Sequence, residues 1–482
     1  MPEITSFVHN GISILSQPAP QPMGPLGGVV LGLVGTAPDA DPQIPRSKAW
    51  RINSPVQAAM LDKTGNERGT LWRAVTEIQK VANVPIYVVI EREETDLEPA
   101  AKDYTMTVVS ATQDDGGPIQ VIVDSSTLLE SVSGSAVNSW TAVVGEKSAA
   151  VQIYTVGEVN TLTLSQNGTL LVSDLNQGTQ ITVKGKDLTP AGTVANIIGK
   201  VDPDTGRRTG IQALISTDES LTHIAAPGFN HKAVCDALAQ MALRISAQPV
   251  LDGPSTNDQD AINFSKSLGT VGTGYDLATL VDPFVKVWSA KAKGYVYMSG
   301  VPHLLGAAAR VNPWEVPGKG RMNVNIDDTQ RTIDYNVMDK ASGGYLLNRY
   351  GITYFAHTSV GGFSVIGNRT LSGRFINKVG LEQAIIRKLI KTADRKMGEN
   401  LTAEFMQQQC DSLNAWLAQE AAAGALIAAQ VYLHPTLNSP EAYLNGEWHI
   451  VIAYGGYSPN EHMVFHLRED VGIVKSFLEE TL

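Results

Sequence analysis

The stretch "GGVVLGLVG" at residues 27–35 decides the fold class, because it is a continuous apolar run with the length of a buried strand. Two helical segments follow at residues 54–61 and 70–83, and the first opens on a Ser-Pro pair that is typical of a helix start. A second apolar run, "PIYVVIERE" at residues 85–93, completes the unit. Buried strands separated by amphipathic helices predict an α/β layer with a partly parallel sheet.

A change in composition marks an inserted domain. Residues 103–192 consist of short alternating runs rich in Ser, Thr, Val and Gly, such as "YTMTVVSA", with turn signals between them. This pattern predicts an all-β sandwich, and the α/β pattern resumes after it. We therefore expect an α/β (α+β) multidomain chain with a mixed-sheet core. The expected divisions are an N-terminal arm and tether (1–26), a core (27–102), the β-sandwich insertion (103–192), the continued core (193–345), a C-terminal core domain (346–468) and a C-terminal arm (469–482).

The composition is that of a folded protein without a general nucleic-acid-binding surface. The chain of 482 residues is 43% hydrophobic and 18% charged, which excludes disorder over most of its length. Its formal net charge of -11 argues against binding a phosphate backbone. Cys235 and Cys410 lie far apart within helical patterns, as expected of buried thiols in a reducing compartment. No Lys or Arg precedes Arg46, and the first apolar run is too short for a bilayer, so we expect a cytoplasmic protein without a membrane anchor.

The sequence offers no set of catalytic or cofactor-binding residues. Three Gly-Lys pairs lack the Ser or Thr that a phosphate-binding loop needs, and Ser364 lacks the second glycine of a nucleophile elbow. His449, His462 and His466, with Glu461 nearby, could form a metal site, but polar positions on a half-exposed sheet explain them better. We therefore expect no catalytic residue, no metal and no cofactor.

A basic stripe stands out on one predicted helix of this acidic chain. In "GLEQAIIRKLIKTADRKM", residues 380–397, the apolar positions form one face and basic side chains gather along another. The pattern fits either an ordinary solvated helix face or an electrostatic contact with an acidic partner. The basic residues are Arg387, Lys388, Lys391 and Arg395.

Both ends of the chain carry apolar segments without an evident partner. Residues 5–15, "TSFVHNGISIL", form a strand-like run that a proline-rich tether at residues 16–25 separates from the first buried strand. The chain closes with "DVGIVKSFLEETL" at residues 470–482, a short apolar tail that follows the last expected core strand at residues 461–469. Each segment raises the question of where its apolar side chains are buried.

A motif near the last third of the chain suggests an answer. The segment "GFSVIGNRTLSG" at residues 362–373 resembles the Gly-x-Arg-Thr-Leu segment of contractile tail sheath proteins of myophages and related particles. Family members often have Trp-Gly-Ala-Arg where this chain has Ile-Gly-Asn-Arg. Three further segments, at residues 29–40, 346–355 and 413–433, resemble the family in the same order. The motif residues are Gly367, Arg369, Thr370 and Leu371.

The resemblance implies a structural protein with no enzymatic activity. Sheath subunits form hexameric rings that stack helically around a tail tube, and they contract to drive the tube through the host envelope. The implied partners are other copies of the chain, the tail tube protein, and the baseplate and tail terminator proteins, with no direct contact to nucleic acid or membrane. The implied location is the virion, after assembly in the host cytoplasm. The β insertion is expected to face outward.

The resemblance also implies roles for the terminal segments and the basic stripe. In the family, N- and C-terminal arms add strands to a neighbour's C-terminal sheet, here expected to include the strands at residues 449–454 and 463–467, and the tethers act as hinges during contraction. The basic stripe is the expected tube contact. The expected arm residues are Phe7, Val8, Ile12 and Ile14 at the N-terminus, and Ile473, Val474, Phe477 and Leu478 at the C-terminus.

Two other functions stay open at this stage. The first is the sheath of a bacteriocin-like or secretion-type injection particle, which the subunit sequence does not distinguish from a phage sheath. The second is an α/β enzyme with an accessory β domain, which would need a pocket with converging acid and base groups.

Overall fold

The computed structural model describes residues 25–94, 101–114, 117–124, 140–155, 160–166, 168–186, 191–268 and 273–481. Within these ranges the chain forms two compact units. The larger comprises Gly28–Arg387 and the terminal segment from Ser458, and the smaller contains Lys388–Tyr457. The smaller unit therefore begins after Arg387 and ends at Tyr457. The sequence suggested instead a single C-terminal domain over residues 346–468.

The larger unit is built on a nine-stranded mixed sheet, as the buried runs predict. Strands β1 (Leu31–Thr36) and β3 (Ile86–Glu91) pair in parallel near one edge of the sheet, and all residues of both are buried. The parallel part runs β3-β1-β10-β11-β12-β17, and antiparallel strands flank it. The other strands are β2 (Trp50–Ile52), β10 (His223–Ala225), β11 (Gln248–Asp252), β12 (Thr279–Val281), β15 (Asn323–Val324), β17 (Ile352–His357) and β18 (Phe363–Ile366).

Helices cover both faces of this sheet, because successive residues of a buried strand point to opposite sides. Leu33 packs with α2 (Leu71–Gln79) and α7 (Val301–Ala309), whereas Val34 packs with α5 (Lys232–Ile245) on the other face. The predicted Ser-Pro helix start is confirmed, since Ser54 caps α1 and accepts a hydrogen bond from the Gln57 amide. The remaining helices are α1 (Pro55–Ala59), α4 (Gly192–Ile198), α6 (Asp258–Ser267), α8 (Gly343–Arg349) and α9 (Ile376–Ala393).

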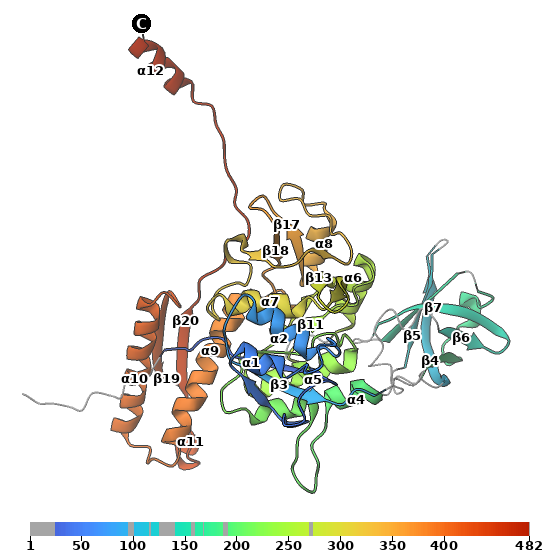
Figure 1. Cartoon of the computed structure of the whole chain (residues 1–482), viewed down its shortest axis with the longest axis horizontal. Helices are drawn as coiled ribbons and strands as arrows, with labels where there is room; N and C mark the ends of the chain where they lie inside the picture. The colour runs from blue at the N-terminus through green and yellow to red at the C-terminus, as the bar shows by residue number, and fades with distance from the viewer. Residues whose placement is uncertain are drawn as a thin grey trace, which may run out of the picture. The chain divides into compact units, whose positions relative to one another are not determined.

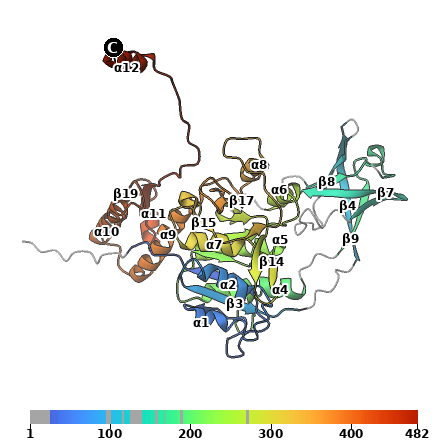
Figure 2. The ribbon, with the colours of Figure 1, turned by 45° about the horizontal axis from the view of Figure 1, so that its top comes forward.

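The insertion is all-β (Figure 2). Its strands close into a six-stranded barrel, so the expected sandwich is wrong. Closure pairs β4 with both β5 and β9 and leaves no open sheet edge. Inside the barrel the rings of Tyr104 and Trp140 stack, with centroids 5.4 Å apart. The strands are β4 (Ala101–Gln113), β5 (Ile119–Val123), β6 (Thr141–Val144), β7 (Lys147–Thr155), β8 (Asn160–Leu164) and β9 (Gln180–Lys186).

A second, three-stranded sheet belongs to the larger unit. The apolar runs at residues 282–290 and 294–300 predict a strand pair, which is present as β13 (Val285–Ser289) and β14 (Gly294–Met298), and β16 (Asp328–Thr329) pairs with β13. The polar sequence of residues 313–339 predicts a surface loop with a short helix, but this segment supplies β16, β15 and a single 3-10 turn at Lys319–Arg321.

Apolar residues at helical spacing predict a helix over residues 401–424, and the smaller unit packs this helix, α10 (Ala403–Ala422), on a two-stranded antiparallel sheet. Strands β19 (Ala428–Leu433) and β20 (Ile450–Gly455) form this sheet, and the short helix α11 (Pro440–Leu444) connects them. Leu413, Trp416 and Leu417 of α10 are buried. A hairpin of two strands has little independent stability, so α10 supplies the missing apolar contact on one face.

The C-terminal segment differs from the expectation. The expected core strand at residues 461–469 has no regular structure, and the expected strand arm is a helix, α12 (Val471–Thr481), whose residues are all exposed (Figure 1). A strand needs a neighbour for its backbone hydrogen bonds, whereas a helix satisfies most of them internally. Because no strand among the described residues pairs with this segment, the helix is the conformation that satisfies its backbone. The N-terminal arm residues Phe7, Val8, Ile12 and Ile14 lie outside the described residues.

None of the described helices has the length and apolar character required to cross a membrane.

The packing of α9 makes a stability prediction. A Cβ atom at Gly380 would overlap the backbone carbonyl oxygen of Pro313. Gly380→Ala should therefore lower the melting temperature by several degrees, although alanine by itself favours a helix by about 1 kcal/mol. The matched control is Gly28→Ala, where the added methyl group meets open space. Equal melting temperatures for both variants in calorimetry would contradict the close approach.

Candidate functional site

The Gly-x-Arg-Thr-Leu motif forms the turn that joins β18 to α9. Gly367 adopts a φ of +133°, and a Cβ atom there would lie 2.7 Å from the Thr353 hydroxyl oxygen, so this position requires glycine. Thr370 is fully buried, and its amide donates to the Arg374 carbonyl. The Leu371 amide donates to the Ala278 carbonyl at 3.0 Å. The turn is thus fixed to the main sheet and presents Arg369 at the surface.

Arg369 holds the beginning of the C-terminal segment. Its Nε donates to Glu461 Oε1 at 3.0 Å and its second terminal nitrogen donates to Glu461 Oε2 at 2.5 Å, which is a bidentate ion pair. The guanidinium also donates to the Gly373 carbonyl and lies 4.1 Å from the centre of the Phe375 ring. These two contacts orient the arginine toward the carboxylate, so we infer that the pair fixes the point at which the tail leaves the larger unit.

Beyond Glu461 the chain exposes a long series of apolar side chains. Leu467 is 98% exposed and Phe465 is 78% exposed, and α12 leaves its apolar residues in solvent as well. Single exposed apolar residues are ordinary, but a run of this length marks a surface that associates with another molecule. The exposed set is Met463, Val464, Phe465, Leu467, Val471, Ile473, Val474, Phe477 and Leu478.

The structure therefore moves the start of the exposed C-terminal tail from the expected residue 469 to residue 463. The expected C-arm residues Ile473, Val474, Phe477 and Leu478 are exposed, as an arm requires, but they lie in a helix. Residues 463–467 were assigned to the receiving sheet, although they are extended and pair with no other described strand. The alternation of Met463, Phe465 and Leu467 predicts a strand, but a strand forms only where a neighbouring strand accepts its hydrogen bonds, and the described part of the chain offers none to this segment.

The basic stripe divides into two kinds of residue. Arg387 is half-buried in the larger unit, where its guanidinium donates to the Ser246 carbonyl and burial lowers its pKa to about 10. Lys391 and Arg395 are exposed, while Lys388 is half-buried and burial lowers its pKa as well. Arg387 thus supports the structure of the larger unit, and the other three residues remain as candidates for a charged contact.

The carboxyl ends of the parallel strands, where α/β enzymes bind ligands, are occupied by the protein's own groups. Asp252 at the end of β11 accepts hydrogen bonds from the Ser299 hydroxyl at 2.7 Å and the Gly228 amide at 2.7 Å. Burial raises its pKa to about 7. The neighbouring Asp282 forms an ion pair with Arg331, which also donates to Asp258. These contacts tie the segment around Arg331 to the core.

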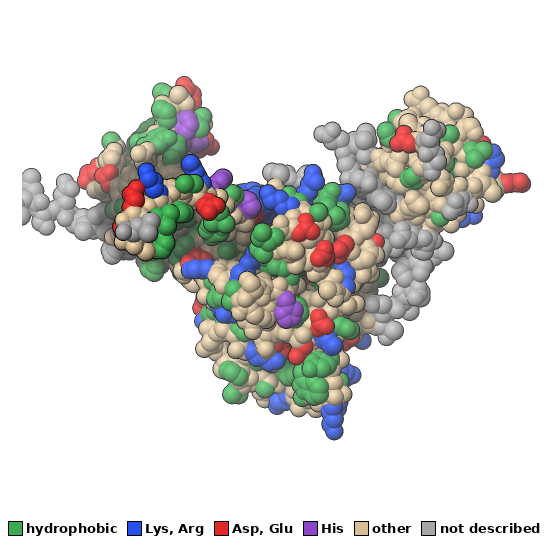
Figure 3. All heavy atoms as spheres, turned by 90° about the horizontal axis from the view of Figure 1, so that it is seen from above, with side chains coloured by type: hydrophobic (Ala, Val, Ile, Leu, Met, Phe, Trp, Pro, Cys, Tyr) green, Lys and Arg blue, Asp and Glu red, His purple; other side chains and the backbone are tan. Residues whose placement is uncertain are grey.

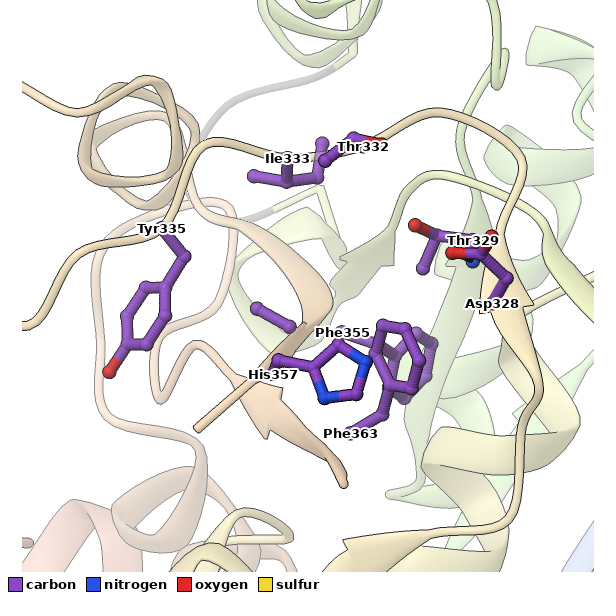
Figure 4. A pocket seen from close by; sticks show the side chains of 9 residues that line it. Asp328, Thr329, Thr332, Ile333, Tyr335, Phe355, His357 and Phe363 are labelled. Atoms are coloured by element: carbon purple, nitrogen blue, oxygen red, sulfur yellow. Dashed lines mark hydrogen bonds between the residues drawn. The ribbon is translucent and has the colours of Figure 1, made fainter. Parts of the chain in front are cut away.

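A small cavity of about 140 Å³ lies between β17, β18 and the segment that follows β16 (Figure 4). Its walls include the aromatic rings of Tyr335, Phe355, His357 and Phe363, and the last two rings lie 4.0 Å apart. Over the described ranges, no three metal-binding side chains are grouped as an ion would need. Asp328 and His357 also line the cavity, and no hydrogen bond or ion pair joins these two side chains.

Comparisons with known proteins agree with the fold and the motif. No family model matches the chain. A protein of Pseudomonas aeruginosa (strain UCBPP-PA14), described as a prophage major tail sheath protein, is 26% identical over 309 residues, which cover 61% of this chain and 76% of that protein.

Solved structures extend the similarity to nearly the whole chain. The PVC sheath complex of an extracellular contractile injection system, in the contracted state, matches with a TM-score of 0.56 at 14% identity, over 97% of this chain and 99% of that chain. The contracted helical sheath of the anti-feeding prophage matches with a TM-score of 0.54 at 14% identity, over 96% and 99%. The chain therefore has the fold of contractile sheath subunits. The resemblance seen in the motif is confirmed, and the curated relative is a tail sheath protein.

The ion pair at the start of the tail can be tested directly. Arg369→Ala should broaden the distance distribution between spin labels at residues 360 and 463, because Glu461 loses its partner. Reversing both charges, Arg369→Glu with Glu461→Arg, should restore part of the order. Arg374→Ala is the matched control, since Arg374 lies in the same turn but pairs with Glu382. An unchanged distribution for Arg369→Ala would show that the pair does not anchor the tail.

Proposed function

We propose that this chain is the structural subunit of a contractile phage tail sheath, which polymerises around a tail tube and contracts to drive the tube through the host envelope. The observation that carries the proposal is the exposed apolar segment at residues 463–478 on a fold that matches sheath subunits over 97% of the chain. Such a segment needs a second molecule to bury it, and repeated head-to-tail contacts generate an open helix. The curated prophage relative favours a phage tail over a free injection particle.

The two-stranded sheet of the smaller unit is the proposed receiver. Adding a strand at an open edge of β19–β20 would pair its backbone groups and enlarge a hairpin that is marginal by itself. We assign residues 463–467 of one copy as the donated C-terminal strand, in place of residues 472–480. The N-terminal residues Phe7, Val8, Ile12 and Ile14 remain the proposed second donor. The tether before β1 and the junction after Tyr457 are the proposed hinges.

Side-chain burial must supply most of the binding free energy. About five backbone hydrogen bonds contribute a net ~1 kcal/mol each, while ordering the same residues costs ~1–2 kcal/mol each, so the backbone alone gains nothing. Burying Phe465 and Leu467 adds roughly 2–3 kcal/mol apiece. On α12, residues Val474, Phe477 and Leu478 lie at helical spacing and would pack against the neighbour as an apolar stripe.

The remaining partners follow from the same role. Lys388, Lys391 and Arg395 are the proposed contact with the tube, without Arg387. The baseplate and tail terminator proteins are the proposed partners at the two ends of the polymer, and the barrel is proposed to face outward. The location would be the virion, after assembly in the host cytoplasm. The role needs neither enzymatic activity nor a cofactor.

Electron microscopy of the purified protein tests the polymer. Negative staining should show striated tubes for the wild type, whereas Phe465→Asp with Leu467→Asp should leave folded monomers, because charges cannot be buried in the donated strand. The matched control is Val360→Asp, an exposed apolar position outside the tail. Wild-type protein that stays monomeric, or tubes formed by the double variant, would contradict the proposal.

The tube contact has a separate test. Lys391→Glu with Arg395→Glu should reduce assembly around purified tubes while tube-free polymers still form, because only the charged contact changes sign. Lys200→Glu with Lys340→Glu is the control for an equal change in net charge. Sedimentation of sheath with tubes measures the effect. Equal co-sedimentation of both variants with the wild type would remove these residues from the contact.

A further inference from the structure

The three-stranded sheet β14-β13-β16 exposes an aromatic face. Its inner side chains, such as Val285 and Met298, belong to the buried core, but Trp288, Tyr295 and Tyr297 are 56%, 54% and 53% exposed. Hydrophobic side chains also reach the surface elsewhere between the charged ones (Figure 3). The hairpin differs because its three large aromatic residues share one face of one sheet, which we call the aromatic face.

The aromatic face is held in place. Trp288 and Tyr295 lie directly opposite each other in the register, with ring centroids 5.4 Å apart and planes at 84°. Lys286 lies opposite Tyr297 and its Nζ is 4.9 Å from the centre of the Tyr295 ring. At the turn, Glu67 accepts hydrogen bonds from the Ser289 hydroxyl and the Lys291 amide. Rigid aromatic side chains of this kind lose little entropy on binding.

The surroundings of the aromatic face are basic. Residues 284–301 contain Lys286, Lys291 and Lys293 and no acidic residue, although the whole chain has a net charge of -11. Asp328 of β16 lies opposite Lys286, and the Glu67 carboxylate at the turn pairs with Arg73, whereas neither Lys291 nor Lys293 forms an ion pair within the described residues. In the part of the chain that the structure describes, the outer edge of β14 pairs with no strand. The surface thus suits an acidic partner.

An acidic region of matching character exists in the same chain. Residues 399–457, most of the smaller unit, contain six acidic residues and neither Lys nor Arg. Glu404 and Asp411 on α10 are exposed. A polymer brings such a surface to the aromatic face at a fixed ratio of one to one, since both belong to every copy.

We propose that the aromatic face of one copy binds the acidic part of the smaller unit, residues 399–457, of a second copy, as a polymer contact separate from the exchanged arms. This inference rests on the proposed sheath function. The aromatic rings would supply the buried centre of the contact, and the lysines would select the orientation.

Photo-crosslinking tests the contact in polymers assembled from equal amounts of ¹⁴N- and ¹⁵N-labelled full-length chain. With p-benzoylphenylalanine in place of Tyr297, mixed-label crosslinks should join the hairpin to peptides within residues 399–457. The same label in place of Tyr345, which is 50% exposed on α8, is the matched control. Crosslinks from position 297 that reach only other parts of the chain would overturn the proposal.

A double variant supplies an independent readout. Trp288→Ala with Tyr295→Ala should raise the concentration needed for polymerisation by about tenfold at unchanged monomer melting temperature, because buried aromatic residues dominate such contacts. Raising the salt concentration should weaken assembly of the wild type more than that of Lys291→Glu with Lys293→Glu. Normal assembly of the aromatic double variant would overturn the contact. Failure of the wild type itself to polymerise would instead contradict the proposed function.

Discussion

Backbone amide and carbonyl groups that leave water need hydrogen-bond partners, and each part of this chain meets that requirement differently. The central strands pair within one sheet that helices cover on both faces. The insertion closes on itself, so its six strands have no open edge. The hairpin β19–β20 stops at two strands, and residues 463–467 carry a strand pattern without a strand to join. The same chain thus has an unpaired sheet edge and a strand-like segment without a paired strand among the described residues, and the proposed polymer would pair the two between copies.

Much of this fold could be predicted from the sequence, because burial leaves a local pattern. The continuous apolar runs of β1 and β3, the capped start at Ser54 and the α10 spacing around Trp416 each depend on residues close together in the chain. The barrel was mistaken for a sandwich because alternation shows which side chains face inward and does not show whether the first and last strands pair. That pairing, β4 with β9, joins residues about 80 positions apart.

The sequence predicted several residues of the candidate site, but it did not predict which of them contact one another. The motif pointed to Gly367 and Arg369, yet Glu461, which gives the arginine its role, lies 92 residues further on. The helical periodicity placed Arg387 in one stripe with three other basic residues. Its side chain instead donates a hydrogen bond to the Ser246 carbonyl of the larger unit. The tail was recognised as apolar, but the described part of the chain supplies no strand for it to pair with, and its proposed partner is a second copy. Long-range contacts and contacts between copies are the two kinds of information that local patterns lack.

The ion pair between Arg369 and Glu461 also sets the volume that the tail can search. About nine extended residues separate Glu461 from α12, so the helix can reach roughly 30 Å from its attachment. A group tethered at that distance has an effective concentration in the millimolar range near its neighbours. Once two copies meet by any other contact, the tail therefore binds as part of the same complex. Adding a subunit to the end of an existing polymer would then be faster than starting a new polymer.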